Sequence, residues 1–260
     1  MNSLIKALAL RPREHIALVG GGGKTTLMFA LAEELRRNGK RVIASTTTKV
    51  WHTEALEYKN LFLARVEAEW KRKTKEGLSR RETVFVGKSL LDSGKVEGIA
   101  PSLADDLFHD SDVDYLVVEA DGSAGHPLKA PGEHEPVIPG STTTMVVAMM
   151  GLEAMGARLD ETAVFRLEQV MRITGLNLGD VITPMALAKV FVHPAGLFKG
   201  SPEGARRVVF LNKGDLLKEE KKAEELAEIL VNDPLKKLER VILGSLKQGV
   251  YQMRTEKERP

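Results

Sequence analysis

Residues 15–26 have the sequence HIALVGGGGKTT, and this stretch decides the fold class. Its first part is an apolar run that ends in glycine, which is typical of a buried strand. From Thr25 onward, leucines recur at helical spacing until Asn38 and Gly39 end the pattern. The stretch therefore predicts a strand, a tight glycine turn and a helix.

The turn between this strand and this helix has the composition of a phosphate-binding loop. Glycines tolerate positive φ angles and let backbone N–H groups face phosphate oxygens. The helix N-terminus adds a partial positive charge, Lys24 can reach the β- and γ-phosphates, and the Thr25 hydroxyl can bind Mg²⁺. The predicted binding residues for a nucleoside triphosphate are Gly20, Gly21, Gly22, Gly23, Lys24, Thr25 and Thr26.

This loop is shorter than the commonest phosphate loop, G-x-x-x-x-G-K-[ST], because Leu18 occupies the position five before Gly23. The compressed G-x-x-G-K-T also resembles the loop of Mur-type amide ligases, which use ATP to activate a carboxylate as an acyl phosphate. Those enzymes carry further domains, for which 260 residues leave no room. An ATP-dependent ligase is therefore the third of three functional hypotheses.

Apolar runs alternate with helical patterns along the rest of the chain. The runs are uninterrupted, as expected of parallel strands covered on both faces. The alternation predicts a single doubly wound α/β domain with a mostly parallel sheet, of the P-loop NTPase type, over residues 1–245. Residues 246–260 are mostly polar and are expected to form a frayed C-terminal tail. Strands are expected at 41–46, 61–64, 83–87, 115–120, 144–150, 207–212 and 240–245, and helices at 101–109, 161–173 and 184–192.

Length, net charge and composition exclude several classes of protein. At about 150 residues per domain, 260 residues form one large or two small domains. Lys plus Arg minus Asp plus Glu is 38 − 36 = +2, so nucleic acid is not the expected partner. The absence of cysteine excludes disulfides, thiolate metal sites and a cysteine nucleophile. No uncharged apolar run approaches the roughly 18 residues of a membrane span, so we expect a cytoplasmic protein without a membrane partner.

Two carboxylates follow the apolar run of YLVVEADG (115–122). Glu119 and Asp121 stand two residues apart, so in a continuing strand both would point to one side. Ligands bind at this end of an open α/β sheet, where a carboxylate can hold Mg²⁺ through water or orient an attacking water. We therefore expect Glu119 and Asp121 to be catalytic, with Thr25 and Glu119 at the metal ion. Thr47, which follows the second strand, is a further candidate for the nucleotide-bound Mg²⁺.

Residues 122–140 contain eight Gly or Pro in nineteen positions, which predicts an irregular loop. Loops of this length in compact domains usually have a function. Lys129 in this loop is expected to contact phosphate or substrate and is the remaining catalytic candidate, beside Lys24. A metal site built from His126 and His134 is not favoured, because no spacing there is diagnostic.

The sequence RVVFLNKGD (207–215) resembles the N-K-x-D element of GTP-binding proteins. Asp215 can accept hydrogen bonds from the two adjacent N–H donors of guanine, and the stem of Lys213 can pack along the base. Asn212, Lys213 and Asp215 are therefore predicted to bind the nucleotide base. In the alternative interpretation, Asp215 caps a helix that begins at Leu216. The order of the motifs along the chain favours GTP over ATP.

The combination of GGGGKTTL, STTTK, EADGSAGHPLKAPGEHEPVIP and NKGD resembles the YqeC family of selenium-dependent hydroxylase accessory proteins. The resemblance covers about residues 15–215 and implies a part in maturing molybdenum hydroxylases that carry selenium. A molybdenum hydroxylase or its cofactor-maturation proteins are then the expected partners. The resemblance carries Lys24, Thr25, Glu119, Asp121, Lys129, Glu135 and Asp215 over as site residues. Without cysteine, the protein cannot carry selenium or sulfur as a cysteine adduct.

Two functional hypotheses are favoured over the ATP-dependent ligase. The first is a Mg²⁺-dependent NTPase, for GTP in preference to ATP, whose hydrolysis drives a cofactor-maturation step on a partner enzyme. The second is a nucleotide-gated binding module, in which the triphosphate orders residues 122–140 to grip a partner and turnover is incidental.

Overall fold

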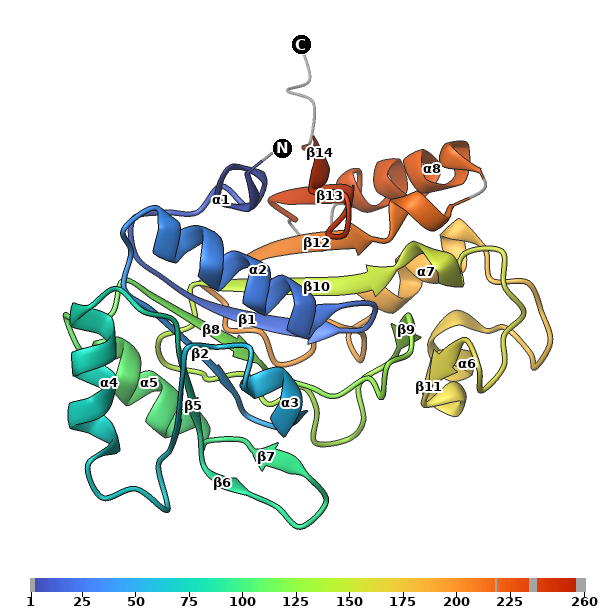
Figure 1. Ribbon diagram of the computed structural model, residues 1–260. Coiled ribbons are helices and arrows are strands. Elements are labelled where there is room, and N and C mark those ends of the chain that lie inside the picture. The colour runs from blue at the N-terminus through green and yellow to red at the C-terminus, as the bar shows by residue number, and fades with distance from the viewer. Residues whose placement is uncertain (1–2, 218, 234–237, 256–260) are drawn as a thin grey trace.

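The computed structural model describes residues 3–217, 219–233 and 238–255. Its main sheet has nine strands in the order β14-β13-β12-β10-β1-β8-β2-β5-β4 (Figure 1). The neighbouring strands are parallel except for β13 and β14, so the mostly parallel α/β fold is confirmed. The strands are β1 (Glu14–Gly20), β2 (Val42–Thr46), β4 (Asn60–Leu63), β5 (Val84–Gly87), β8 (Tyr115–Glu119), β10 (Met145–Gly151), β12 (Arg206–Asn212), β13 (Arg240–Ser245) and β14 (Val250–Arg254).

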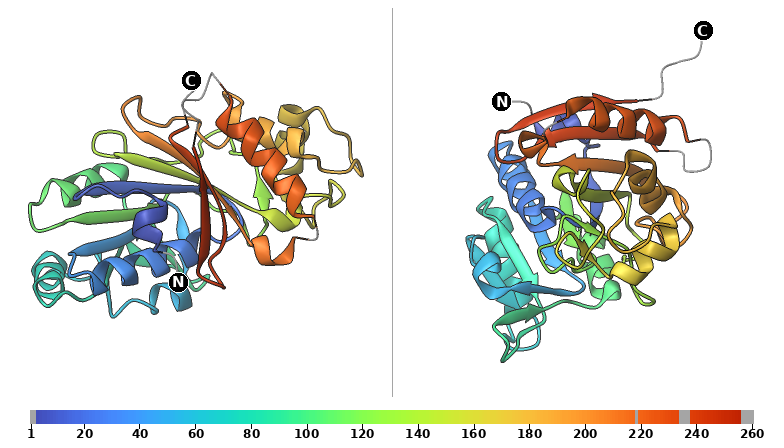
Figure 2. Two further views of the ribbon diagram at one scale, coloured as in Figure 1. Left: turned by 90° about the horizontal axis from the view of Figure 1, so that it is seen from above. Right: turned by 90° about the vertical axis from the view of Figure 1, so that its right-hand side faces the viewer.

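Helices cover both faces of this sheet (Figures 1 and 2). On one face, Ile16 and Leu18 of β1 pack with α1 and α2. On the other face, Ala17 and Val19 pack in a core with α6, α7 and α8, while α4 and α5 pack over β2, β5 and β8. Every residue of β1 and β8 is buried, which explains the uninterrupted apolar runs at 16–19 in β1 and 115–118 in β8. The helices are α1 (Leu4–Ala7), α2 (Lys24–Arg37), α3 (His52–Ala55), α4 (Trp70–Ser79), α5 (Pro101–His109), α6 (Leu167–Thr174), α7 (Pro184–Val192) and α8 (Glu220–Val231).

Two small sheets were not predicted from the sequence. The first has three antiparallel strands in the order β3-β7-β6, and the second pairs β9 with β11 in parallel. Each of these strands is only two or three residues long, which leaves too short a pattern to recognise in the sequence. They are β3 (Lys49–Trp51), β6 (Ser89–Leu90), β7 (Lys95–Glu97), β9 (Leu128–Lys129) and β11 (Val164–Phe165).

Two expectations about local structure were wrong. Residues 250–254 are not frayed, because they form β14, which pairs antiparallel with β13 at the edge of the main sheet. Its buried Tyr251 packs against Phe210, while Val250, Gln252 and Met253 are exposed, so no alternation of apolar and polar residues marks the strand in the sequence. Of the remaining residues of that expected tail, 256–260 lie outside the described residues. The helix expected at 161–173 begins only at Leu167, after β11.

Charged and polar groups are buried at the amino end of the main sheet. Glu14 is fully buried and pairs with Arg206. Beside it, His15 Nδ1 lies 2.7 Å from the hydroxyl oxygen of Thr142, which donates to Asp105 Oδ1 at 2.7 Å. Burial lowers the pKa of His15 to about 4, against the weaker pull of Asp105. The polar groups at this end of the sheet are therefore enclosed within the protein.

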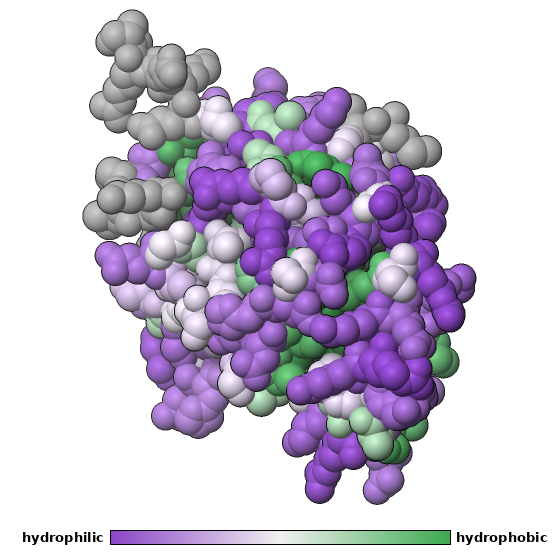
Figure 3. Space-filling view, turned by 90° about the vertical axis from the view of Figure 1, so that its left-hand side faces the viewer, coloured by the Kyte–Doolittle hydropathy of each residue, from purple (hydrophilic) through white to green (hydrophobic). Residues whose placement is uncertain are grey.

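The surface over α4 is mainly hydrophilic, with small separate apolar areas (Figure 3). Basic residues of α4 have acidic neighbours: Arg72 pairs with Glu69 and Glu76, and Lys75 Nζ lies 2.9 Å from Asp110. In the described parts of the chain, no helix has both the length and the apolar character that a membrane crossing requires.

Candidate functional site

A cavity of about 780 Å³ opens at the carboxyl ends of β1, β2 and β8. The glycine-lysine-threonine loop forms part of its wall, together with Glu119, Lys213 and part of the loop at 122–140. The segment after β2, from Thr47 to Trp51, completes the other side. The separate sequence elements that predicted a nucleotide site therefore meet around one cavity.

The glycine loop holds its shape by close backbone contacts. Gly22 has a φ of 72°, and its N–H donates to the carbonyl of His126 at 3.1 Å. A Cβ added to Gly22 would lie 2.1 Å from the backbone nitrogen of Gly151, so a larger residue cannot fit without moving the backbone. Glycine is required at this position for both φ and space.

The N-terminus of α2 offers free donors to the cavity. The N–H groups of Gly23, Lys24, Thr25 and Thr26 have no hydrogen-bond acceptor within the described residues. The same four residues line the cavity wall. Free N–H groups at a helix N-terminus, with the partial positive charge of the helix, form a binding site for anions such as phosphate.

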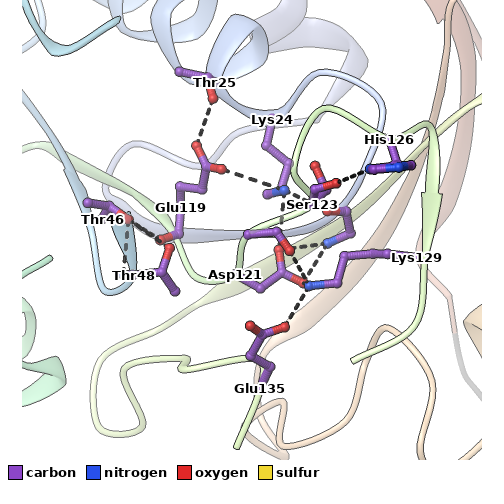
Figure 4. Close-up of polar contacts among 12 residues, drawn as sticks. Lys24, Thr25, Thr46, Thr48, Glu119, Asp121, Ser123, His126, Lys129 and Glu135 are labelled. Carbon is purple, nitrogen blue, oxygen red and sulfur yellow. Dashed lines mark hydrogen bonds and ion pairs between the residues drawn. The ribbon is translucent and has the colours of Figure 1, made fainter. Parts of the chain in front are cut away.

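The side chain of Lys24, in the glycine-lysine-threonine loop, lies beside the carboxylates of Glu119 and Asp121 (Figure 4). Its Nζ donates to the carbonyl of Gly20 at 2.6 Å and lies 3.3 Å from Asp121 Oδ1 and 3.5 Å from Glu119 Oε1. The residue is only 3% exposed. Burial by itself would lower the pKa of Lys24, but the carboxylates of Asp121 and Glu119 raise it above its usual value. Lys24 is therefore a buried, charged ammonium at the edge of the cavity.

The side-chain oxygens of Glu119 and Thr25, both of a type that can bind a metal ion, lie next to each other. The Thr25 hydroxyl donates to Glu119 Oε2 at 3.0 Å. Burial raises the pKa of Glu119, while the charge of Lys24 opposes that shift. Mg²⁺ prefers hard oxygen ligands and takes most of its shell from water and phosphates. Thr25 and Glu119 thus fit a nucleotide-bound Mg²⁺, although no cluster of three or more His, Asp or Glu able to hold a metal occurs in the described ranges.

Asp121 is fully buried and does not border the cavity. Its two carboxylate oxygens each accept the N–H of Gly20 at 3.0 Å. Oδ1 faces Lys24, and Oδ2 lies 3.0 Å from Nζ of Lys129 on the other side. Asp121 and Glu119 do approach the same group, Lys24, but only Glu119 faces the cavity. The geometry suits Asp121 to positioning the loop and the two lysines.

Lys129 lies behind the cavity wall, although the sequence predicted contact with a ligand. It is fully buried, and its ammonium donates to the carbonyl of Gly122 at 2.5 Å and to Glu135 Oε2 at 2.7 Å, beside Asp121. All three donors of this ammonium therefore have acceptors within the loop at 122–140 and the strand end.

Arg166 borders the cavity and was missed by the sequence analysis. Its Nη2 donates to Glu135 Oε1 at 2.7 Å, so Glu135 bridges Arg166 and Lys129. The pairing of β9 with β11 brings these residues together, and no motif in the sequence marks that pairing. A chain of charged contacts thus runs from Lys24 through Asp121 to Arg166.

Thr47 borders the cavity, but its hydroxyl already has a partner. The hydroxyl donates to the carbonyl of Val137 at 2.6 Å, and the Thr47 N–H donates to the carbonyl of Glu119 at 3.1 Å. The neighbouring Thr46 hydroxyl donates to the same Glu119 carbonyl at 3.0 Å. These contacts attach the threonine segment to the acidic strand end, and they turn the Thr47 hydroxyl toward the loop at 122–140.

The side chain of Asn212 joins three loops. Its Nδ2 donates to the carbonyl of Gly22 at 2.8 Å, and its Oδ1 accepts the N–H of Leu246 at 3.0 Å. Lys213, with a φ of 63°, borders the cavity and pairs with Glu153. The loop after β13 therefore belongs to the site, which the sequence analysis missed because that loop carries no recognisable motif.

Asp215 lies next to the main cavity in a depression of about 400 Å³ that Gly244, Ser245 and Gln248 also line. Within the described residues its carboxylate has no hydrogen-bond donor or ion-pair partner. The helix-cap alternative is wrong, because Asp215 sits inside the 3₁₀ helix Gly214–Leu216 and α8 begins only at Glu220. Asp215 is therefore available to a ligand.

A strand, a glycine loop and a helix that starts with Lys and Thr define a P-loop NTPase-like α/β fold, and this class of fold indicates nucleotide binding. The chain belongs to the YqeC family, because the family model described as YqeC protein matches residues 16–168. The protein YqeC of Escherichia coli (strain K12) is 37% identical over 198 residues, which cover 76% of this chain and 75% of that protein.

Two solved structures are similar to this chain. FtsY from Mycoplasma mycoides has a TM-score of 0.42 and 12% identity, over 98% of this chain and 69% of that chain. HypB from Helicobacter pylori, in complex with nickel, has a TM-score of 0.38 and 12% identity, over 91% of this chain and 80% of that chain. The family model ends before the segment at 212–215, so the base-binding hypothesis rests on the chain's own geometry.

Proposed function

We propose that the protein binds and hydrolyses a nucleoside triphosphate with Mg²⁺, GTP in preference to ATP, and that this drives a maturation step on a selenium-carrying molybdenum hydroxylase. The observation that carries the nucleotide part is the meeting of Lys24, Thr25 and Glu119 with the free N–H groups of a helix N-terminus at one cavity. The hydroxylase part rests on the resemblance of the sequence motifs to the YqeC family.

The triphosphate would bind where the N–H groups of α2 meet the cavity. Lys24 then exchanges its contacts with Glu119 and Asp121 for the β- and γ-phosphates. Asp121 keeps the Gly20 N–H and the Lys129 ammonium, so it is not left without partners. Mg²⁺, held by Thr25 and Glu119, supplies charge neutralisation at the phosphate oxygens.

Glu119 and Asp121 have different roles in this proposal, because only Glu119 borders the cavity. Glu119 borders the cavity, so it can hold the metal's water or orient an attacking water. Asp121 is fully enclosed, so its part is to position Lys24 and the glycine loop. Lys129 likewise acts through Asp121 and Glu135.

The preference for GTP rests on Asp215. Among the residues that the structure describes, its carboxylate has no partner, and it borders a depression close to the point where Asn212 ties the glycine loop to β12. Guanine presents two adjacent N–H donors that match a carboxylate, and adenine does not.

Dissociation constants of GTP and ATP with Mg²⁺, measured on the unmodified protein and on Asp215→Ala, test this proposal. An unpaired polar group costs about 1–3 kcal/mol, up to about a hundredfold in affinity, so GTP should lose its advantage in the variant. Glu220→Ala removes an exposed carboxylate from the rim of the same depression and is the matched control. If the unmodified protein binds ATP as tightly as GTP or more tightly, ATP replaces GTP as the proposed nucleotide. The ligase hypothesis then ranks second.

Phosphate release by Lys24→Ala tests hydrolysis. The variant lacks the ammonium proposed to contact the β- and γ-phosphates, so turnover should disappear. Lys222 pairs with Glu219 and does not border the cavity, so Lys222→Ala should hydrolyse normally. Hydrolysis that survives Lys24→Ala would show that the activity arises elsewhere.

A nucleotide-gated binding module is the second candidate. Charged contacts connect the glycine loop to residues 122–140, running from Lys24 through Asp121 and Lys129 to Glu135. A displacement of Lys24 would therefore change the contacts of residues 122–140. A non-hydrolysable triphosphate should then protect this loop from proteases while turnover stays negligible. Protection together with rapid turnover would favour the NTPase.

A further inference from the structure

The cavity extends beyond the glycine loop to one face of the small sheet β3-β7-β6. Side chains alternate along its strands, so Lys49 and Trp51 of β3 share a face with Lys95 and Glu97 of β7. All four border the same cavity as the glycine loop. The residues between them are buried on the opposite face.

Two cations on this face have no acidic partner. In the part of the chain that the structure describes, the ammonium groups of Lys49 and Lys95 make no ion pair and no hydrogen bond. Lys95 Nζ lies 4.4 Å from the centroid of the Trp51 ring, and Trp51 is 51% exposed. Glu97 is neutralised by Lys88, whose Nζ lies 2.6 Å away.

One further carboxylate, Glu54, borders this part of the cavity. It accepts the backbone N–H of Trp51 at 3.1 Å, so it holds the turn that presents the indole. The face therefore presents two ammonium groups and an aromatic ring beside two carboxylates, and both carboxylates already have donors: Glu54 accepts the Trp51 N–H, and Glu97 pairs with Lys88.

Backbone contacts fix this sheet against the phosphate end of the cavity. The N–H of Gly98 donates to the carbonyl of Thr48 at 2.7 Å, and the N–H of Ile99 donates to the carbonyl of Thr46 at 2.8 Å. A Cβ on Gly98 would lie 2.5 Å from the Thr48 nitrogen. Because Thr46 also contacts the Glu119 carbonyl, the lysine-bearing face is preformed next to the acidic strand end.

The face lies on the opposite side of the glycine loop from Asp215. In the main sheet, β12 and β2 flank β1 on opposite sides, and Asp215 follows β12 while β3 follows β2. A triphosphate whose base lies at Asp215 would thus leave this face free beyond its terminal phosphate.

We propose that Lys49, Trp51 and Lys95 form a subsite for a second ligand, an anionic organic molecule with a flat aromatic ring. The ammonium groups bind its phosphate or carboxylate, and the exposed indole stacks on its ring. The subsite rests on the proposed function only for the identity of its neighbour, the nucleotide.

Phenyl phosphate is a suitable probe, with two fragments for comparison: phenol, which lacks the charge, and inorganic phosphate, which lacks the ring. The chain has two tryptophans, and the other one, Trp70, is only 7% exposed, so Trp70→Phe leaves Trp51 as the fluorescent reporter. With a non-hydrolysable GTP analogue filling the phosphate loop, phenyl phosphate should quench Trp51 saturably, and each fragment should bind at least about tenfold more weakly. Calorimetry on the unmodified protein should give the same order of affinities.

Variants locate the binding. Lys49→Gln and Lys95→Gln should each weaken phenyl phosphate binding by up to about fivefold. The matched control is Lys59→Gln, which removes a lysine that is paired with Glu82 and does not border the cavity, and its affinity for phenyl phosphate should stay unchanged. Trp51→Leu, measured by calorimetry, should abolish the advantage of phenyl phosphate over inorganic phosphate.

Binding that does not saturate, or that is the same in the double variant Lys49→Gln, Lys95→Gln, overturns the subsite. Loss of phenyl phosphate binding in Lys24→Ala but not in the double variant would also overturn it, because the probe would then occupy the phosphate loop. If the GTP analogue fails to bind while the probe still depends on Lys49 and Lys95, the subsite stands and the nucleotide function fails.

Discussion

Both ends of the main sheet bury charged or titratable groups, but they do so in different ways. At the amino end, Glu14 pairs with Arg206, and His15 is enclosed as an uncharged ring. At the carboxyl end, Lys24 and Asp121 are just as buried, yet Lys24 borders a cavity of about 780 Å³ beside the N-terminal N–H groups of α2, and Asp121 lies 3.3 Å from its ammonium. The same kind of group is closed within the fold at one end and kept next to a ligand site at the other.

The physical reason is the cost of an unpaired buried charge. Removing one partner of a buried pair costs about 3–5 kcal/mol, because the other charge is left without compensation. Substitutions at either end should therefore lower stability, whereas only those at the carboxyl end should also change nucleotide binding.

Asp121→Ala should have the largest effect. It leaves the ammonium groups of Lys24 and Lys129 buried without their shared carboxylate. We expect the free energy of unfolding, measured by urea denaturation, to fall by about 3–5 kcal/mol. The control is Asp114→Ala just before the other end of β8, where the partly exposed pair with Arg41 should cost about 1 kcal/mol. Equal losses in the two variants would contradict the comparison.

His15 should give a pH dependence that belongs to the amino end alone. In the folded protein its pKa is lowered to about 4, whereas in the unfolded chain it titrates near 6.5. As the pH falls from 6.5 to 4, the unfolded state takes up a proton that the folded state does not, so stability is lost in this window. The loss attributable to His15 is about 3 kcal/mol.

Urea denaturation at several pH values, on the unmodified protein and on His15→Asn, measures this loss. Asparagine keeps a polar group near Thr142 but does not titrate, so the variant should lose less stability between pH 6.5 and 4. GTP affinity at neutral pH should change less than twofold. Parallel pH profiles would show that His15 does not cause the loss.

Thr25 and Thr47 should differ in their effect on Mg²⁺, by a smaller amount. Thr25→Ala removes a ligand next to Glu119 and should raise the Mg²⁺ concentration required for GTP binding about tenfold, or about 1.4 kcal/mol, while Thr25→Ser should restore it. Thr47→Ala removes a hydroxyl that donates to Val137 and should change the requirement less than twofold. An equal change in both would place Thr47 at the metal.

Much of the fold could be predicted because its patterns are local. Residues 16–19 of β1 and 115–118 of β8 are apolar without interruption, since both faces of these strands are covered. The strand β14 was not predicted because Tyr251 is its only buried residue and the apolar Val250 and Met253 are exposed, so its sequence shows no strand-like alternation. The short strands β3, β7, β9 and β11 depend on partners distant in the chain and leave no local pattern.

The candidate site divides in the same way. The GGGGKTT sequence alone determined the glycine loop, because positive φ angles and a helix start are properties of consecutive residues. The burial of Lys129, its contact with Glu135 and the approach of Arg166 arose only from tertiary packing. The same holds for Lys49 and Lys95, whose place at the cavity depends on how β3 and β7 pair and on how closely Gly98 approaches Thr48. Residue types specify what chemistry is available, and packing decides which of those groups reach a ligand.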